Sequence, residues 1–254
     1  MSNYDRSTPG RFGAGISRTG TGALDQGLRA YMLGVYNHMT IGVALTGLVA
    51  YFTNYLAVAS TETGKLALTP LGQTLYTSPL RWVVMLAPLA FVMFFSFKIN
   101  TMSASSARAM FYSFAAAMGL SLSVILLVYT QTSIARAFFI TAATFGSLSL
   151  YGYTTKTDLS PIGSFCYMAL FGIIIASVVN IFVGSMDFRY VLSVITVLVF
   201  AGLTAWDTQN IKDMYLESDH PEIAAKKSIN GALELYLDFI NIFQSIITLF
   251  GDRR

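Results

Sequence analysis

Seven apolar stretches, each close to the length that crosses a bilayer, constrain this chain more than any other feature. A hydrocarbon core about 30 Å thick takes about 20 helical residues at 1.5 Å each. The charge content agrees, because only 11% of the 254 residues are charged, whereas a soluble domain carries about a quarter. We therefore predict an all-α, multi-pass membrane protein with spans near 31–56, 81–97, 107–130, 133–154, 160–182, 188–207 and 229–250.

The connections between these stretches predict one helical bundle. All are short except 57–80 and 216–228, so residues 29–254 form a single seven-helix transmembrane domain. Residues 1–28 are polar and lack the apolar core of a signal peptide, and we expect a disordered cytoplasmic tail. With the N-terminus inside, ten of the 16 Lys and Arg residues face the cytoplasm, as the positive-inside rule favours. Seven spans then put the C-terminus outside. Arg253 and Arg254 argue against this placement, because the positive-inside rule favours arginines on the cytoplasmic side.

Several classes of function find no support in the residue content. The net charge of +3 gives no reason to expect nucleic acid as a partner. The one cysteine, Cys166, cannot form an internal disulfide, and we expect it to be a small buried side chain. His38 and His220 lie far apart, so no metal-ligand spacing is present. There is no Ser/His/Asp set, HExxH or phosphate loop, so we expect neither an enzyme nor a cofactor.

Two aspartates interrupt the apolar runs near the C-terminus. The segment "GLTAWDTQNIKDMY" places Asp207 at the end of the sixth span, and "ALELYLDFINIF" places Asp238 within the seventh. An Asp at mid-span costs about 2.5–3.5 kcal/mol on insertion. Such residues usually face the bundle interior and mark an ion or proton path. Because the two spans are antiparallel neighbours, the carboxyl groups can meet in the inner half of the membrane. For Asp207 alone, an interfacial position explains the sequence equally well.

A pair of carboxyl groups at close range can act as a proton-controlled latch. The two groups share one proton and titrate as a unit. The latch is closed while the proton is shared and opens when both groups ionise and repel. Once ionised, Asp207 and Asp238 offer oxygen ligands that can hold calcium transiently. Polar residues with helical spacing supply pore-lining candidates: Asn230, Glu234 and Asn241 on the seventh span, and Thr204 on the sixth. For Glu234, solvent exposure explains the sequence equally well.

The same segments resemble a known family. "GLTAWDTQNIKDMY" and "ALELYLDFINIF" are similar to the closing segments of the Bax inhibitor family, the transmembrane Bax-inhibitor-motif proteins. "FKINTMSASSARAMFYSFAAAMGLSLS" is similar to that family's region from the second to the third span. The resemblance covers about residues 30–250 and is greatest to bacterial members. It implies a location in the bacterial inner (plasma) membrane.

The resemblance also implies an architecture and a sensor. The family's last helix is central and surrounded by the other six, and its proposed pH sensor is an aspartate pair that matches Asp207 and Asp238. A basic residue at the inner end of the second helix pairs with the sixth-helix aspartate, and the nearest match is Lys98. A Lys cannot form the two parallel hydrogen bonds of an Arg, and a positive-inside anchor explains Lys98 equally well. The second span carries Pro88 and none of the acids that some members have there.

Three functions follow from these observations. The first is a pH-sensitive calcium leak channel that the aspartate pair gates, with protons as the regulator; the family is associated with such a leak. The alternative is a regulatory protein that binds a membrane protease or another stress or cell-death partner, since eukaryotic members suppress cell death. A proton-coupled transporter is third, because no inverted repeat or matching broken helices are visible.

Overall fold

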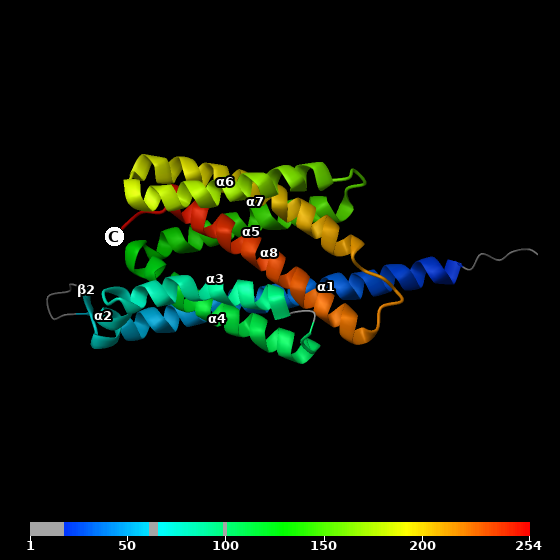
Figure 1. Cartoon of the computed structure of the whole chain (residues 1–254), viewed down its shortest axis with the longest axis horizontal. Helices are drawn as coiled ribbons and strands as arrows, with labels where there is room; N and C mark the ends of the chain where they lie inside the picture. The colour runs from blue at the N-terminus through cyan, green and yellow to red at the C-terminus, as the bar shows by residue number, and fades with distance from the viewer. Residues whose placement is uncertain (1–17, 61–65, 99–100) are drawn as a thin grey trace, which may run out of the picture.

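The computed structural model is a bundle of helices with one small β-hairpin at its edge (Figure 1). It describes residues 18–60, 66–98 and 101–254, so residues 1–17 of the predicted tail lie outside the described part. The elements in chain order are α1 (Arg18–Ala57), β1 (Val58–Ser60), β2 (Leu66–Leu68), α2 (Pro70–Tyr76), α3 (Leu80–Lys98), α4 (Ala104–Val128), α5 (Gln131–Thr154), α6 (Ser160–Val183), α7 (Met186–Asp213) and α8 (Pro221–Phe250).

The predicted all-α membrane fold is confirmed. Six of the described helices are long and apolar enough to cross a membrane, namely α1 from Gln26 onward and α4 to α8. The predicted second span is α3, which follows the short helix α2 after a bend of 61°. The described chain therefore has six spans, or seven if this bent pair makes one crossing. Predicted and observed helices differ mainly at two ends: α1 begins at Arg18 and α8 at Pro221, each well before the predicted span.

Local signals explain most helix boundaries. The hydroxyl groups of Ser103, Thr130 and Ser185 accept backbone N–H groups in the first turns of α4, α5 and α7. Prolines occupy the first turns of α2, α6 and α8, where their missing N–H has no helical partner to lose. Helix α6 ends at Gly184, whose φ of 67° suits glycine. Apolar length and these caps together set the spans.

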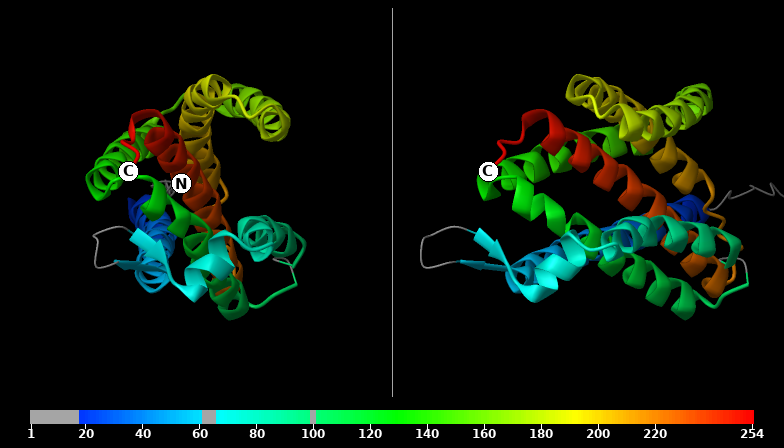
Figure 2. Two further views of the ribbon diagram at one scale, coloured as in Figure 1. Left: turned by 90° about the vertical axis from the view of Figure 1, so that its left-hand side faces the viewer. Right: turned by 60° about the vertical axis from the view of Figure 1, so that its left-hand side comes forward.

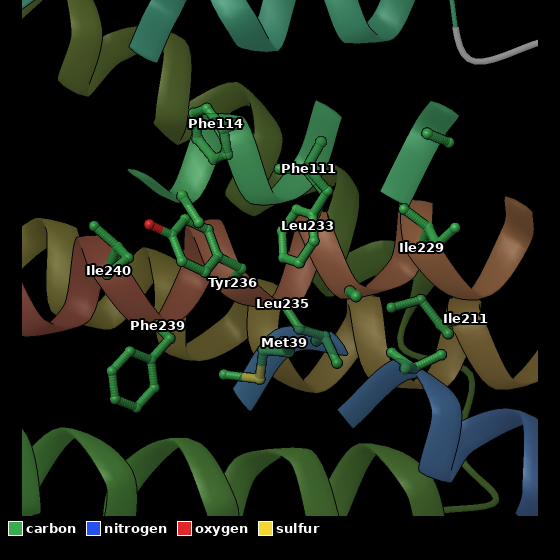
Figure 3. Close-up of a cluster of buried hydrophobic side chains, with 14 of the residues drawn as sticks. Met39, Phe111, Phe114, Ile211, Ile229, Leu233, Leu235, Tyr236, Phe239 and Ile240 are labelled. Carbon is green, nitrogen blue, oxygen red and sulfur yellow. The ribbon is translucent and has the colours of Figure 1, made fainter. Parts of the chain in front are cut away.

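Helix α8 is the most buried of the spans. In its most apolar window 56% of the residues are buried, against 11% for α6. The ring of Tyr236 packs edge-on against Phe111 and Phe114 of α4, with ring centroids 5.7 and 5.5 Å apart (Figure 3). The principal contacts of α8 are with α1, α4, α5 and α7, whereas α3 packs mainly on α4 and α6 mainly on α7. A ring of six helices around α8 stays a prediction.

Three glycines allow close approaches among α5, α6 and α7. A methyl group at Gly152 of α5 would overlap the backbone carbonyl of Ala205 on α7. A methyl at Gly163 of α6 would overlap the ring of Trp206 on α7. On the same face of α7, Gly202 leaves room for the thiol of Cys166, which is buried as expected. Small residues let backbones approach closely in lipid, so α5, α6 and α7 form a tight group.

The start of α1 and the C-terminus lie at opposite ends of the bundle (Figures 1 and 2). After α8 the last residues pair with the turn between α4 and α5. The amide of Thr130 donates to Asp252 O at 3.0 Å, and the amide of Arg254 donates to Val128 O at 2.9 Å. The hydroxyl of Ser133 accepts the Asp252 amide at 3.0 Å. We call residues 252–254 with these partners the C-terminal clamp.

Candidate functional site: an acidic cluster between α7 and α8

The two predicted aspartates face each other across the contact between α7 and α8. Asp207 is 4% exposed and Asp238 is 3% exposed. Their carboxyl groups lie within hydrogen-bonding range, and the Thr204 side chain lies within the same range of Asp238. A carboxylate can only accept hydrogen bonds, so a bond between these two groups requires that one of them carries a proton. The structure thus brings together the residues on which a shared-proton latch depends.

A third acid lies beside the pair. Glu234 is one helical turn before Asp238 on α8 and is close enough to interact electrostatically with both aspartates. The amide of Asn230 donates to Glu234 Oε1 at 2.8 Å. We call Asp207, Glu234 and Asp238 the acidic cluster. The sequence left Glu234 open between a pore-lining role and simple solvent exposure, and the structure places it beside the aspartate pair.

Each acid of the cluster has one buried oxygen without a partner in the described protein: Asp207 Oδ1, Glu234 Oε2 and Asp238 Oδ2. Buried polar atoms are nearly always paired, so unpaired ones need a specific explanation. A shared proton satisfies part of this deficit, and water or a passing cation satisfies the rest. Among the described residues, no group of three or more His, Cys, Asp or Glu side chains has a metal-binding arrangement.

The other pore-lining candidates separate into two places. Thr204 stays with the pair, although its hydroxyl donates to Phe200 O at 2.7 Å. Asn241 lies further along α8, where its amide donates to Leu237 O at 2.8 Å. It lines a cavity of about 400 Å³ between α6, α7 and α8. We call this cavity the polar cleft, because these hydroxyl and amide side chains line it: Ser177, Ser193, Thr196, Asn241, Gln244, Ser245 and Thr248.

The candidate counter-ion Lys98 lies apart from the cluster. It is exposed at the last residue of α3, and α3 packs mainly on α4. The only ion pair among the described residues joins Lys227 and Asp219 at 2.6 Å. No contact between Lys98 and Asp207 is therefore seen in the described part of the chain.

Comparison with known proteins decides the family. The family model described as "Inhibitor of apoptosis-promoting Bax1" matches residues 28–254. The chain belongs to the Bax inhibitor family. An uncharacterised protein of Rickettsia prowazekii is 42% identical over 230 residues, 91% of this chain and 92% of the relative. The inner membrane protein YbhL of Escherichia coli K12 is 42% identical over 231 residues, 90% and 94% of the two chains. An uncharacterised Caulobacter vibrioides protein is 39% identical over 233 residues.

Two further polar residues of this Bax inhibitor family member escaped the sequence reasoning. Thr208 and Gln209 follow Asp207 directly, and both are buried. The Thr208 hydroxyl lies 3.0 Å from that of Ser149 on α5, and the Ser149 hydroxyl lies 2.6 Å from that of Tyr36 on α1. This hydroxyl chain ties α1, α5 and α7 together next to the aspartate pair.

Proposed function

We propose that this protein is a pH-sensitive cation leak channel of the bacterial inner membrane, with calcium as the transported ion and the N-terminus in the cytoplasm. The observation that carries the proposal is the face-to-face burial of Asp207 and Asp238 with unpartnered oxygens. The inner-membrane assignment follows the E. coli relative, whose name states that location. No chemical catalysis and no resident cofactor form part of this function.

The latch works through the charge on the pair. With one proton present, the carboxyl groups of Asp207 and Asp238 hydrogen-bond and hold α7 against α8. When that proton leaves, two negative charges face each other. Two unit charges about 4 Å apart repel by about 4 kcal/mol at an effective dielectric constant of about 20. A hydrogen bond to a charged group is worth about 1.5–3 kcal/mol, so repulsion exceeds the attraction it replaces. The contact between the helices then loosens and admits water.

The polar cleft supports a cation as the transported species. Its side chains offer neutral oxygens of the kind that coordinate calcium. Thr196 and Phe200, which line the cleft, precede Thr204 by two turns and one turn of α7, so cleft and pair lie along the same helix. Glu234 and Asn230 continue the polar line on the other side of the pair. A cation that leaves the cleft would meet the ionised pair next.

The test is calcium flux into liposomes that contain the purified full chain and a calcium indicator. We expect the flux to rise as the pH increases, because the shared proton is lost. Asp207→Asn and Asp238→Asn should both hold the latch closed, since an amide donates to the remaining carboxylate without a titratable proton. The expected loss at high pH is about tenfold, the effect of about 1.4 kcal/mol. Asp187→Asn, at the exposed start of α7, is the matched control and should behave as wild type.

Two results would overturn the channel. One is a wild-type flux equal to that of protein-free liposomes at every pH. The other is a pH response that survives both substitutions in the pair.

The second candidate function is regulation of a membrane-bound partner, such as a protease or a cell-death protein. The family description, which names inhibition of a Bax-type protein, favours it. Deleting residues 1–17 removes none of the described helices. The deletion therefore tests whether a partner protein binds the N-terminal segment. Loss of the partner in a pull-down, with calcium flux unchanged, would support this function. Unchanged capture would exclude the segment as the docking element.

A further inference from the structure

A cavity of about 460 Å³ lies between α1 and α5 and shares no lining residue with the polar cleft. Both helices pack on α8, and the cavity lies between them. Two of its walls are open to the bilayer, since Leu33 is 52% exposed and Leu150 is 63% exposed. Gly146 forms part of the α5 wall, where a methyl group would meet nothing within 4 Å. The cavity therefore opens toward lipid and contains unfilled space.

One charged side chain lines this otherwise largely apolar cavity. Arg29 of α1 is exposed, and it has no carboxylate partner among the described side chains. Near the same end, Lys212 Nζ donates to Tyr153 O at 3.1 Å and lies 5.8 Å from the centre of the Tyr153 ring. Tyr153 itself lines the cavity. An unpaired guanidinium beside an apolar groove that faces lipid has the two chemical features of an anionic phospholipid site.

We propose that this cavity binds an anionic phospholipid. Its phosphate lies at the Arg29 guanidinium, and one acyl chain lies against Leu33, Phe145 and Leu150 in the space beside Gly146. The guanidinium suits a phosphate because its planar donors match two phosphate oxygens at once. The bilayer supplies the ligand, since the open side of the cavity faces lipid. This proposal is independent of whether the protein conducts ions.

The cavity wall is connected to the candidate site. Tyr36 and Ser149 line the cavity, and the hydroxyl chain continues from Ser149 to Thr208 on α7. Thr208 is the residue after Asp207, so a lipid in this cavity contacts side chains that are one hydrogen bond (Ser149) or two (Tyr36) from α7. A bound lipid is therefore connected to α7 through these hydrogen bonds, without contacting the acidic cluster.

Native mass spectrometry of the full chain tests the proposal by counting retained lipids in micelles with equal phosphatidylglycerol and phosphatidylcholine. We expect wild type to retain the anionic lipid about fivefold over the zwitterionic one, the preference that one basic residue confers. Arg29→Gln should abolish the preference, and Gly146→Trp should reduce retention of both lipids. Arg136→Gln, an exposed arginine near the other end of α5, should match wild type. Gly172→Trp, on open space of α6, should match it too.

Three outcomes would overturn the site. Equal retention of the two lipids by wild type removes the charge recognition. Equal loss of preference in Arg29→Gln and Arg136→Gln assigns the preference to general surface charge. Wild-type retention in Gly146→Trp places the lipid elsewhere. Soluble glycerol phosphate that displaces the lipid would show that a headgroup alone suffices and that the apolar groove has no role.

Discussion

Asp207, Thr208 and Gln209 are consecutive residues of α7, yet their side chains contact three different parts of the bundle. Asp207 faces α8, and Thr208 bonds to Ser149 on α5. Gln209 reaches the connection between α5 and α6, where its Oε1 accepts the Leu159 amide at 2.8 Å. Its Nε2 donates to Thr157 O at 2.9 Å. This three-residue run therefore organises much of the α5–α8 half of the molecule.

Replacing Gln209 by Met should destabilise the fold. The apolar side chain keeps a similar volume but leaves the Leu159 amide and the Thr157 carbonyl without their partner. Unsatisfied buried groups cost about 1–3 kcal/mol each, so we expect a loss of about 2–4 kcal/mol in the free energy of unfolding. Unfolding in mixed micelles measures it. Gln73→Met, at an exposed position of α2, is the control, and an equal loss there would contradict the role of Gln209.

The acids could be found from sequence, but their polar neighbours could not. Asp207 and Asp238 stand out because charge inside an apolar run is costly, and consecutive antiparallel spans predict their proximity. A threonine or glutamine in a membrane helix costs little and gives no such signal. The partners of Thr208 and Gln209 lie about 50–60 residues earlier in the chain, and helical spacing within one span does not reveal them.

At the scale of elements, glycine positions determine which helices can touch. Gly152→Ala should push α5 away from α7, because the added methyl meets a backbone carbonyl that cannot rotate away. Overpacking of this kind costs about 1–3 kcal/mol, occasionally more. Gly146→Ala on the same helix adds its methyl to open space and should be close to neutral. Thermal unfolding in detergent compares the two. Similar midpoints for both variants would contradict the close contact.

The region between the first and second spans contains secondary structure that the sequence did not predict. Residues 57–80 were expected to be a linker, but they contain β1, β2 and α2. Val58 pairs with Leu68 in an antiparallel hairpin. Pro79 disfavours helical backbone at Ser78, so α2 ends at Tyr76 and α3 begins at Leu80 in a new direction. Hydropathy detects apolar length and does not report a bend.

At the scale of the whole molecule, two groups of helices meet at α8 (Figure 2). The first group is α1 to α4 and the second is α5 to α7. Cavities of about 460 and 530 Å³ lie between the groups, both bounded by α1 and α5. The acidic cluster lies on the other side of α8, where it meets α7. In the proposed channel, separation of the pair would act on the second group of helices, and the spaces between the groups would leave room for that movement.

Removing the C-terminal clamp should loosen the bundle at one end. Deletion of residues 252–254 eliminates two backbone–backbone hydrogen bonds to the turn between α4 and α5. It also eliminates two hydrogen bonds between Asp252 and the Ser133 hydroxyl. At about 1 kcal/mol each, the expected loss is about 4 kcal/mol in the free energy of unfolding. Arg254→Ala keeps the backbone amide and should have little effect. Unfolding in mixed micelles distinguishes the two variants, and equal stability of the deletion and wild type would show that the clamp contributes nothing.

The clamp also limits how α8 can move. At its far end α8 is attached to the preceding loop through Lys227, whose Nζ donates to Met214 O at 2.9 Å and to Asp219 at 2.6 Å. Because α8 is held at both ends, these contacts oppose its translation along the helix axis. Rotation about that axis and sideways tilt remain, and rotation alone turns Asp238 away from Asp207. In the proposed channel, opening would therefore occur by rotation of α8, with no change in how far this helix extends through the membrane.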